Sequence, residues 1–152
     1  MLILGSMPGE ASLKLRQYYG HPHNQFWRLL GEVLGEDLRG KNYRGRLAVL
    51  KRRKIALWDT LAFCRREGSL DSAIQDERPN RIIPLLRRHR IKAVFLNGQK
   101  ARAVFLRHHR GSPHKVKIFT LLSSSPANAS FSFKEKLRSW RRIELYARTV
   151  RR

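Results

Sequence analysis

Two polar stretches of the chain carry side chains that could perform chemistry. YYGHPHNQFW, residues 18–27, gathers two tyrosines, two histidines and an asparagine between a glycine-rich turn and an apolar stripe. SSSPANAS, residues 123–130, is rich in serine, and such segments expose backbone N–H groups and allow close approach of an anion. Neither stretch contains a carboxylate, so a reaction at these positions must use neutral groups.

Several common kinds of catalytic site are absent from the sequence. The turn GSMPG has neither the spacing nor the lysine of a nucleotide-binding loop. Ser-His-Asp catalysis lacks its Gly-x-Ser-x-Gly elbow. Six histidines, few carboxylates and the single Cys64 give no metal-ligand spacing, so we expect neither a metal nor a cofactor.

Hydrolysis of an N-glycosidic bond suits a site without strong acids or bases. The reaction passes through an oxocarbenium-like sugar, which a positioned water can capture without a powerful base. An asparagine carbonyl can orient that water, backbone N–H groups can stabilise charge on the departing base, and an aromatic ring can stack on its face. A base in a duplex must first be flipped out, which requires phosphate contacts and a loop that fills the gap.

The charge of the chain favours a polyanionic partner. The 33 lysines and arginines against 11 acidic residues give a formal net charge of +22, and the basic segments are spread over the whole chain. A membrane surface is not favoured, because no basic segment is paired with a long exposed apolar face. The alternative is a solvated basic surface without a partner.

Length and composition indicate a single domain over residues 1–152. A 41% hydrophobic fraction suffices for a globular core, and no apolar run reaches the roughly 18 residues of a membrane span. The start of the chain has no basic region before its apolar run, so we expect no cleavable signal. One cysteine cannot form an internal disulfide, and we expect a monomer in the cytoplasm.

Apolar runs alternate with helical stripes along the chain. The predicted strands are residues 1–6, 54–60, 91–97 and 115–122, and the predicted helices are 26–34 ending at Gly35, 46–54, 80–90 capped by Asn80, 98–111 ending at Gly111, and 133–148. Trp27, Trp58 and Trp140 fall within these apolar patterns, so we expect them in the core. The alternation predicts an α/β fold, a three-layer α/β/α sandwich around a mostly parallel four-stranded sheet.

Ligands of such sheets bind beyond the carboxyl ends of the strands. The loops that follow the four predicted strands are residues 5–13, 58–70, 97–100 and 123–131. We therefore expect these loops to meet the 18–27 stretch at one site.

Five blocks of the sequence together resemble one known family. They are LILGSMPG, YYGHPHNQFW, ALWDTLAFCRREGSLDSAI, FLNGQKA and SSSPANASFSFKEKL, and they extend from residue 1 to about residue 142. In this order they resemble the hypoxanthine-DNA (deoxyinosine) glycosylase family of the uracil-DNA glycosylase superfamily. The resemblance implies the same sandwich fold and an enzyme that flips a deaminated base, hypoxanthine first and uracil or xanthine next, from double-stranded DNA and hydrolyses its bond to deoxyribose.

The resemblance also implies roles for particular residues. Asn24 would orient the attacking water, and Tyr19 would stack on the flipped base. Met7 occupies the position where many superfamily members carry a catalytic asparagine or aspartate, and its thioether cannot orient water. The residues expected at the base are Gly5, Ser6, Met7, Gly9, Tyr19 and Asp59. Those expected to contact DNA are His21, Lys100, Ser123, Ser124, Ser125, Pro126, Ala127 and Asn128.

Each of these assignments has an alternative. Asn24 could serve only as a helix N-terminal residue that satisfies a backbone N–H, and Asp59 could only cap a turn. Tyr18 is expected in the core, and Lys100 fits a solvated face as well as a DNA contact. Met7 and the +22 charge favour a noncatalytic nucleic-acid-binding module on the same fold as the competing function. A glycosidase that acts on free nucleosides is a third, which would leave the basic surface unexplained.

Overall fold

Two apolar strands form the centre of the sheet. In the computed structural model, which describes residues 1–65, 67, 69–70, 72, 74–109 and 115–147, β1 (Leu2–Gly5) pairs with β5 (Ala93–Asn97). Strand β2 (Ala56–Asp59) lies on the other side of β1, and β6 (Lys117–Leu121) lies on the outer side of β5. All three pairings are parallel, which confirms the predicted sheet.

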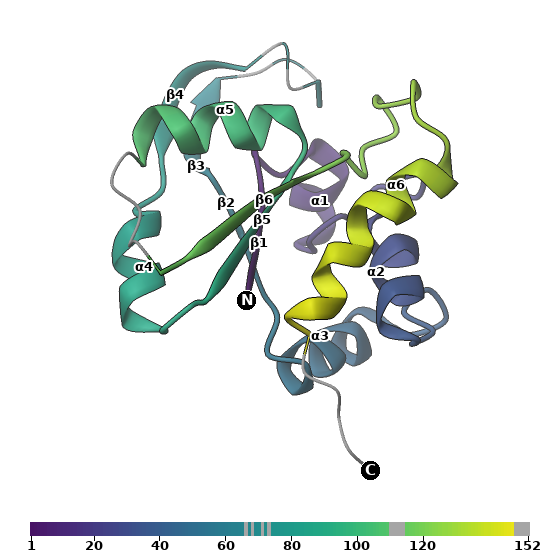
Figure 1. Ribbon diagram of the computed structural model, residues 1–152. Helices are drawn as coiled ribbons and strands as arrows, with labels where there is room; N and C mark the ends of the chain where they lie inside the picture. Colours follow the sequence, from purple (N-terminus) through teal and green to yellow (C-terminus); the bar gives the residue numbers. More distant parts are fainter. Residues whose placement is uncertain (66, 68, 71, 73, 110–114, 148–152) are drawn as a thin grey trace.

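Helices cover both faces of this sheet, because successive side chains of β1 and β5 point to opposite sides. Ile3 and Phe95 pack in a core beneath α2 (Phe26–Leu34), α3 (Tyr43–Arg52) and α6 (Phe133–Trp140). Leu2, Leu4, Val94 and Leu96 pack beneath α4 (Ile82–Arg88) and α5 (Gln99–His108). Figure 1 shows the two groups of helices on opposite sides of the strands, which confirms the three-layer sandwich.

Helix α2, which precedes the long loop to α3, has the predicted bounds. Its apolar stripe is buried against the sheet, and Gly35 ends it with φ 62°, a left-handed conformation that glycine adopts without strain. Helix α3 begins at Tyr43, three residues earlier than predicted, because the Asn42 side chain accepts a hydrogen bond from the Gly45 N–H and caps it.

The helix predicted over residues 133–148 is two elements. Helix α6 ends at Trp140, and the 3₁₀ helix η2 (Arg141–Leu145) follows it directly. Arg148 and Gly111, two predicted helix ends, lie outside the described residues.

Three elements lie where the sequence predicts loops. Helix α1 (Glu10–Leu15) follows the first turn, and β3 (Leu61–Arg65) and β4 (Gln75–Pro79) form an antiparallel pair. Glu77 on β4 makes ion pairs with Lys100 and Arg107 on α5. These ion pairs attach the two-stranded sheet of β3 and β4 to α5. Figure 1 shows β4 next to α5 accordingly.

Two further predictions are wrong. Asn80 does not cap α4, because the N-cap of that helix is Arg81. The side-chain amide of Asn80 instead donates hydrogen bonds to the carbonyls of Asp59 and Leu61, across the junction of β2 and β3. Trp58 is 44% exposed, because β2 is an edge strand of the sheet. The other two tryptophans are buried as predicted.

Among the described residues, no helix combines the length and the apolar character required to cross a bilayer.

The capping box at the start of α6 should contribute measurably to stability. The Ser132 hydroxyl accepts a hydrogen bond from the Glu135 N–H, and the Glu135 carboxylate accepts one from the Ser132 N–H. We expect Ser132→Ala to lower the free energy of unfolding by about 1 kcal/mol, measured by urea denaturation. The control is Ser130→Ala at an exposed position two residues earlier, where the change should stay within about 0.5 kcal/mol. Equal effects of the two substitutions would contradict this role.

Candidate active site

A cavity of about 1050 Å³ lies at the carboxyl ends of the four parallel strands. Its walls come from the turn after β1, the 18–24 segment, the end of β2, residues 97–100 and the 121–131 segment. Every residue that the sequence points to lines it: Gly5, Ser6, Met7, Gly9, Tyr19, His21, Asn24, Asp59, Lys100, Ser123, Ser124, Ser125, Pro126, Ala127 and Asn128. The predicted convergence of loops is therefore present in the structure.

Asn24 lies two residues before α2, whose N-cap is Gln25, and lines the cavity. Its Oδ1 accepts a hydrogen bond from the Phe26 N–H at 3.0 Å, so the backbone hydrogen bond expected as the alternative is present. A carbonyl oxygen has two lone pairs, and the helix N–H uses one. The remaining lone pair can accept a hydrogen bond from a water in the cavity. The hydrogen bond to Phe26 thus holds the amide at a fixed orientation and does not exclude a chemical role.

The start of α2 is also bound to the serine loop, residues 123–130. The Gln25 N–H donates to the Ser124 carbonyl at 3.0 Å. Asn97, at the end of β5, donates to the Ser124 hydroxyl at 2.9 Å and accepts from the Ser124 N–H at 3.0 Å. Ser124 is fully buried. Asn97 is a site residue that the sequence analysis missed, although a polar side chain at the carboxyl end of a buried strand was the available signal.

The serine loop satisfies much of its own backbone. The Ser123 hydroxyl accepts from the Ser125 N–H, and the Ser125 hydroxyl accepts from the Ala127 N–H, both at 3.2 Å. The Asn128 side chain closes the loop by donating to the Ser123 carbonyl. A hydroxyl that accepts from an N–H still has its own proton to donate. The groups suited to an anion here are therefore the serine hydroxyls, more than the N–H groups that the sequence suggested.

Tyr19 is held by core packing. Its ring stacks on Phe26 with centroids 3.7 Å apart and an interplanar angle of 6°. One face of the ring is thus covered, and Tyr19 lines the cavity. A planar ligand in the cavity can use the opposite face. Tyr18 is half-buried against the same core, as predicted.

Gly5 allows Asp59 and Tyr19 to approach each other at the base of the cavity. A Cβ at Gly5 would lie 2.7 Å from Asp59 Oδ1 and 3.1 Å from Tyr19 Oη, so no side chain fits there. Asp59 is 8% exposed, and burial raises the pKa of its carboxyl to about 7. Burial, followed by the nearby Asp59 charge, raises the pKa of Tyr18 to about 12.

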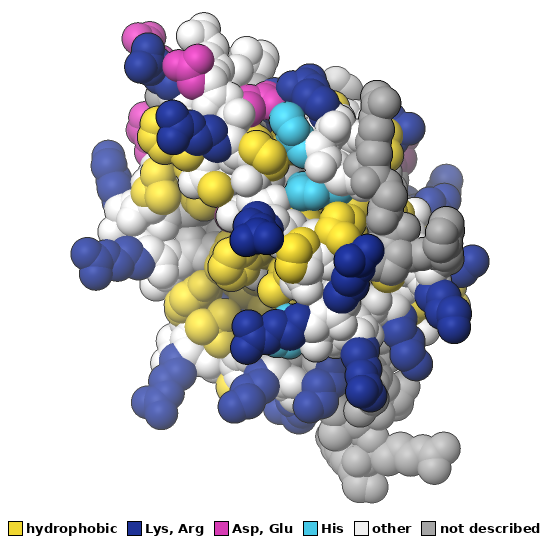
Figure 2. All heavy atoms as spheres, turned by 90° about the vertical axis from the view of Figure 1, so that its left-hand side faces the viewer, with side chains coloured by type: hydrophobic (Ala, Val, Ile, Leu, Met, Phe, Trp, Pro, Cys, Tyr) yellow, Lys and Arg dark blue, Asp and Glu magenta, His cyan; other side chains and the backbone are white. Residues whose placement is uncertain are grey.

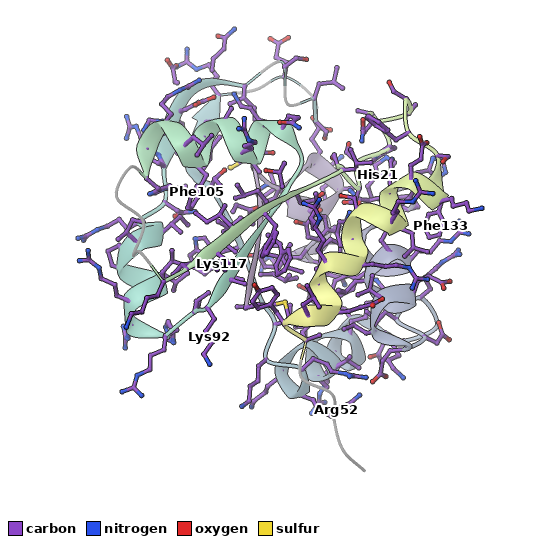
Figure 3. All side chains as sticks on the ribbon, in the orientation of Figure 1. His21, Arg52, Lys92, Phe105, Lys117 and Phe133 are labelled. Atoms are coloured by element: carbon purple, nitrogen blue, oxygen red, sulfur yellow. The ribbon has the colours of Figure 1, made fainter. Side chains whose placement is uncertain are left out.

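Three other predicted residues have distinct surroundings. His21 is exposed at the cavity mouth, near the end of the molecule where α6 begins (Figure 3). Lys100 lines the cavity, but its ammonium is ion-paired with Glu77. Met7 packs against Leu61 and its apolar neighbours, so it forms part of the wall. Within the described part of the chain, no group of three or more metal-ligating side chains is present.

The structure is that of an α/β protein with a cavity at the carboxyl edge of a parallel sheet, which is where proteins of this class bind their ligands. Residues 1–146 match the family described as the uracil DNA glycosylase superfamily. The chain belongs to this superfamily, which confirms the family and the fold expected from the sequence.

Individual proteins resemble the chain over nearly its whole length. A hypoxanthine DNA glycosylase of Methanosarcina barkeri (strain Fusaro / DSM 804) is 45% identical over 141 residues, covering 92% of this chain and 87% of the relative. One of Methanosarcina acetivorans is 40% identical over 149 residues, covering 94% and 89%. The solution NMR structure of a candidate uracil DNA glycosylase from Methanosarcina acetivorans matches with a TM-score of 0.76 and 38% identity, covering 94% of this chain and 89% of that one.

Burial of Asp59 should make stability depend on pH. Because its pKa of about 7 in the folded protein exceeds the ordinary 3.8, the folded state binds this proton more tightly than the unfolded chain does. The contribution of this proton to the free energy of unfolding is fully present below about pH 4 and is lost as the pH rises through about 7. We expect the free energy of unfolding to fall by up to about 4 kcal/mol more in the unmodified protein than in Asp59→Asn between pH 4 and pH 8.

Urea denaturation at the two pH values measures this difference. The matched control is Asp76→Asn, which makes the same substitution at a side chain that is 64% exposed. Parallel pH profiles for the unmodified protein and Asp59→Asn would show that the carboxyl ionises as readily in the folded state as in the unfolded one.

Proposed function

We propose that this protein is a monofunctional DNA glycosylase that removes hypoxanthine from double-stranded DNA, with uracil and xanthine as further substrates. The observation that carries the proposal is the meeting of Asn24, Tyr19, Asp59 and the serine loop in one cavity. The relatives named hypoxanthine DNA glycosylase, at 40% and 45% identity, support an enzyme over a noncatalytic module. We further propose that the protein acts as a monomer at the DNA in the cytoplasm, since no substrate contact in this mechanism requires a second chain.

DNA is held by charge and by hydroxyl groups. The net charge of +22 attracts the duplex from a distance, and basic side chains extend even over the face that carries α4, as Figure 2 shows. Close to the cavity, the hydroxyls of Ser123 and Ser125 donate to phosphate oxygens, and His21 contacts the strand at the mouth. Lys100 contributes less charge to the phosphates, because Glu77 neutralises it.

The flipped base stacks on Tyr19 and meets Asp59 at its edge. Hypoxanthine, uracil and xanthine share a lactam edge, on which one N–H donor lies next to one carbonyl acceptor. A neutral carboxyl group presents the complementary pair of one acceptor and one donor. Burial, which raises the pKa of Asp59 to about 7, maintains much of this neutral form near neutral pH.

Asn24 orients the water that attacks the sugar. The water oxygen bonds to C1′ as the bond from C1′ to the base nitrogen breaks, and a proton from the water ends on the departing base. A carboxamide suffices because the oxocarbenium-like sugar is already a strong electrophile. Lys100 is the one lysine lining the cavity among the described residues, and its pairing with Glu77 does not favour a Schiff base. The reaction therefore ends at an abasic site without strand cleavage.

Removal of the Asn24 amide should abolish turnover but not binding. We expect Asn24→Ala to lower the single-turnover rate on a labelled duplex containing deoxyinosine by at least about 100-fold, read as alkali-labile abasic sites. Its dissociation constant for the same duplex should change by less than about threefold. The matched control is Asn42→Ala, which removes another hydrogen-bonded amide, one that does not itself line the cavity. Full activity of Asn24→Ala would refute the mechanism.

The same assay on the unmodified protein distinguishes a DNA glycosylase from a noncatalytic binding module and from a nucleosidase. Duplexes with deoxyinosine, deoxyuridine or deoxyxanthosine are compared with undamaged DNA and with free inosine. Abasic sites in any deaminated duplex support the proposal. Steeply salt-dependent binding without base preference and without abasic sites would indicate the noncatalytic module, and cleavage of free inosine alone would indicate a nucleosidase.

A further inference from the structure

Large apolar side chains are exposed at the mouth of the cavity. Leu13 on α1 and Leu70 are each 56% exposed, and Phe131 is 41% exposed, although all three line the cavity. Exposed apolar groups that gather around a cavity mark a surface that binds a partner. Under the proposed function, on which this inference rests, that partner is the duplex around the flipped nucleotide.

Phe131 is presented by a rigid segment. It follows the serine loop and directly precedes Ser132, whose backbone is fixed by the capping box of α6. Its neighbour Phe133 behaves differently: that ring is partly buried in the core and is covered by the Arg28 guanidinium, 3.8 Å from its centroid. Among the described residues, no aromatic ring or cation stacks on Phe131. Figure 3 shows Phe133, and therefore the start of α6, at the same end of the molecule as His21.

A flipped nucleotide leaves a gap between two stacked bases, and an apolar group must occupy it to prevent the nucleotide from returning. The exposed tip of the serine loop carries Pro126 and Ala127. The methyl group of Ala127 is too small to fill that gap, and the ring of Pro126 is smaller than a phenyl ring and not aromatic. Leucine and phenylalanine can both insert between bases, but only the planar phenyl ring also stacks on them. Of the three exposed side chains, Phe131 therefore has both the shape and the position next to the strand-binding loop.

We propose that Phe131 is the wedge of this enzyme, a ring that inserts between the bases flanking the lesion and stacks on them while the damaged nucleotide occupies the cavity. The ring acts only on duplex DNA, since a single strand has no opposing stack to restore. Phe131 is thus a positioning residue, distinct from the residues that contact the reacting atoms.

The test compares single-turnover cleavage of deoxyinosine in a duplex and in a single strand of the same sequence. We expect Phe131→Ala to lower the duplex rate by about tenfold or more and the single-strand rate by less than about twofold. Phe131→Trp, which retains a stacking ring, should keep most of the duplex rate. The control is Leu145→Ala, which removes an 80% exposed side chain on η2 and should change neither rate. Equal losses on both substrates, or none on the duplex, would overturn the proposal.

A second measurement does not require cleavage. A 2-aminopurine placed next to the deoxyinosine reports by its fluorescence the loss of the stacked hypoxanthine, which a phenyl ring replaces only in part. Binding of the unmodified protein should raise the fluorescence, and binding of Phe131→Ala should not. If the protein binds and unstacks this probe without forming abasic sites, the wedge stands and the glycosylase function fails. If abasic sites form but Phe131→Ala unstacks the probe as well as the unmodified protein, the function stands and the wedge fails.

Discussion

The site depends on one constraint, which is that all four strands of the sheet run in the same direction. Parallel strands place their carboxyl ends at one edge, so loops that are far apart in the sequence must meet there. The two central strands are buried on both faces and give the edge a rigid base. A reversal of any one strand would move a wall of the cavity to the far edge of the sheet.

The side chains proposed to act in catalysis are held in place by contacts with the core. Tyr19 stacks on Phe26, which is fully buried, and Asn24 accepts the hydrogen bond of the Phe26 N–H. The serine loop is tied to the end of β5 through Asn97 and to the start of α2 through Gln25. These contacts fix the aromatic ring, the amide and the loop relative to one another before a ligand arrives. A site that relies on neutral groups needs this preorganisation, because precise positioning must compensate for the lack of a strong acid or base.

Much of this arrangement could be predicted from the sequence, for physical reasons. Buried parallel strands such as β1 and β5 are continuous apolar runs, and α2 has a regular apolar stripe that ends at a glycine. The pairing of β3 with β4 could not be predicted, because the polar residues of β4 form no apolar pattern. That strand is held instead by backbone pairing and by ion pairs with α5. The exposure of Trp58 depends on the order of strands in the sheet, which no local pattern encodes. The hydrogen bonds between Asn97 and Ser124 join residues 27 positions apart, so no local sequence pattern could predict them.

In the proposed mechanism, a flipped base lies on Tyr19 while Asn24 directs water to its sugar. A crystal structure with a duplex that contains 2′-fluoro-deoxyinosine, in which fluorine slows cleavage, tests it most directly. We expect hypoxanthine in the cavity, parallel to the Tyr19 ring with the ring centroids about 4.5 Å apart, and a water between Asn24 Oδ1 and C1′. A hypoxanthine that stays stacked in the duplex, or a sugar held away from Asn24, would contradict it.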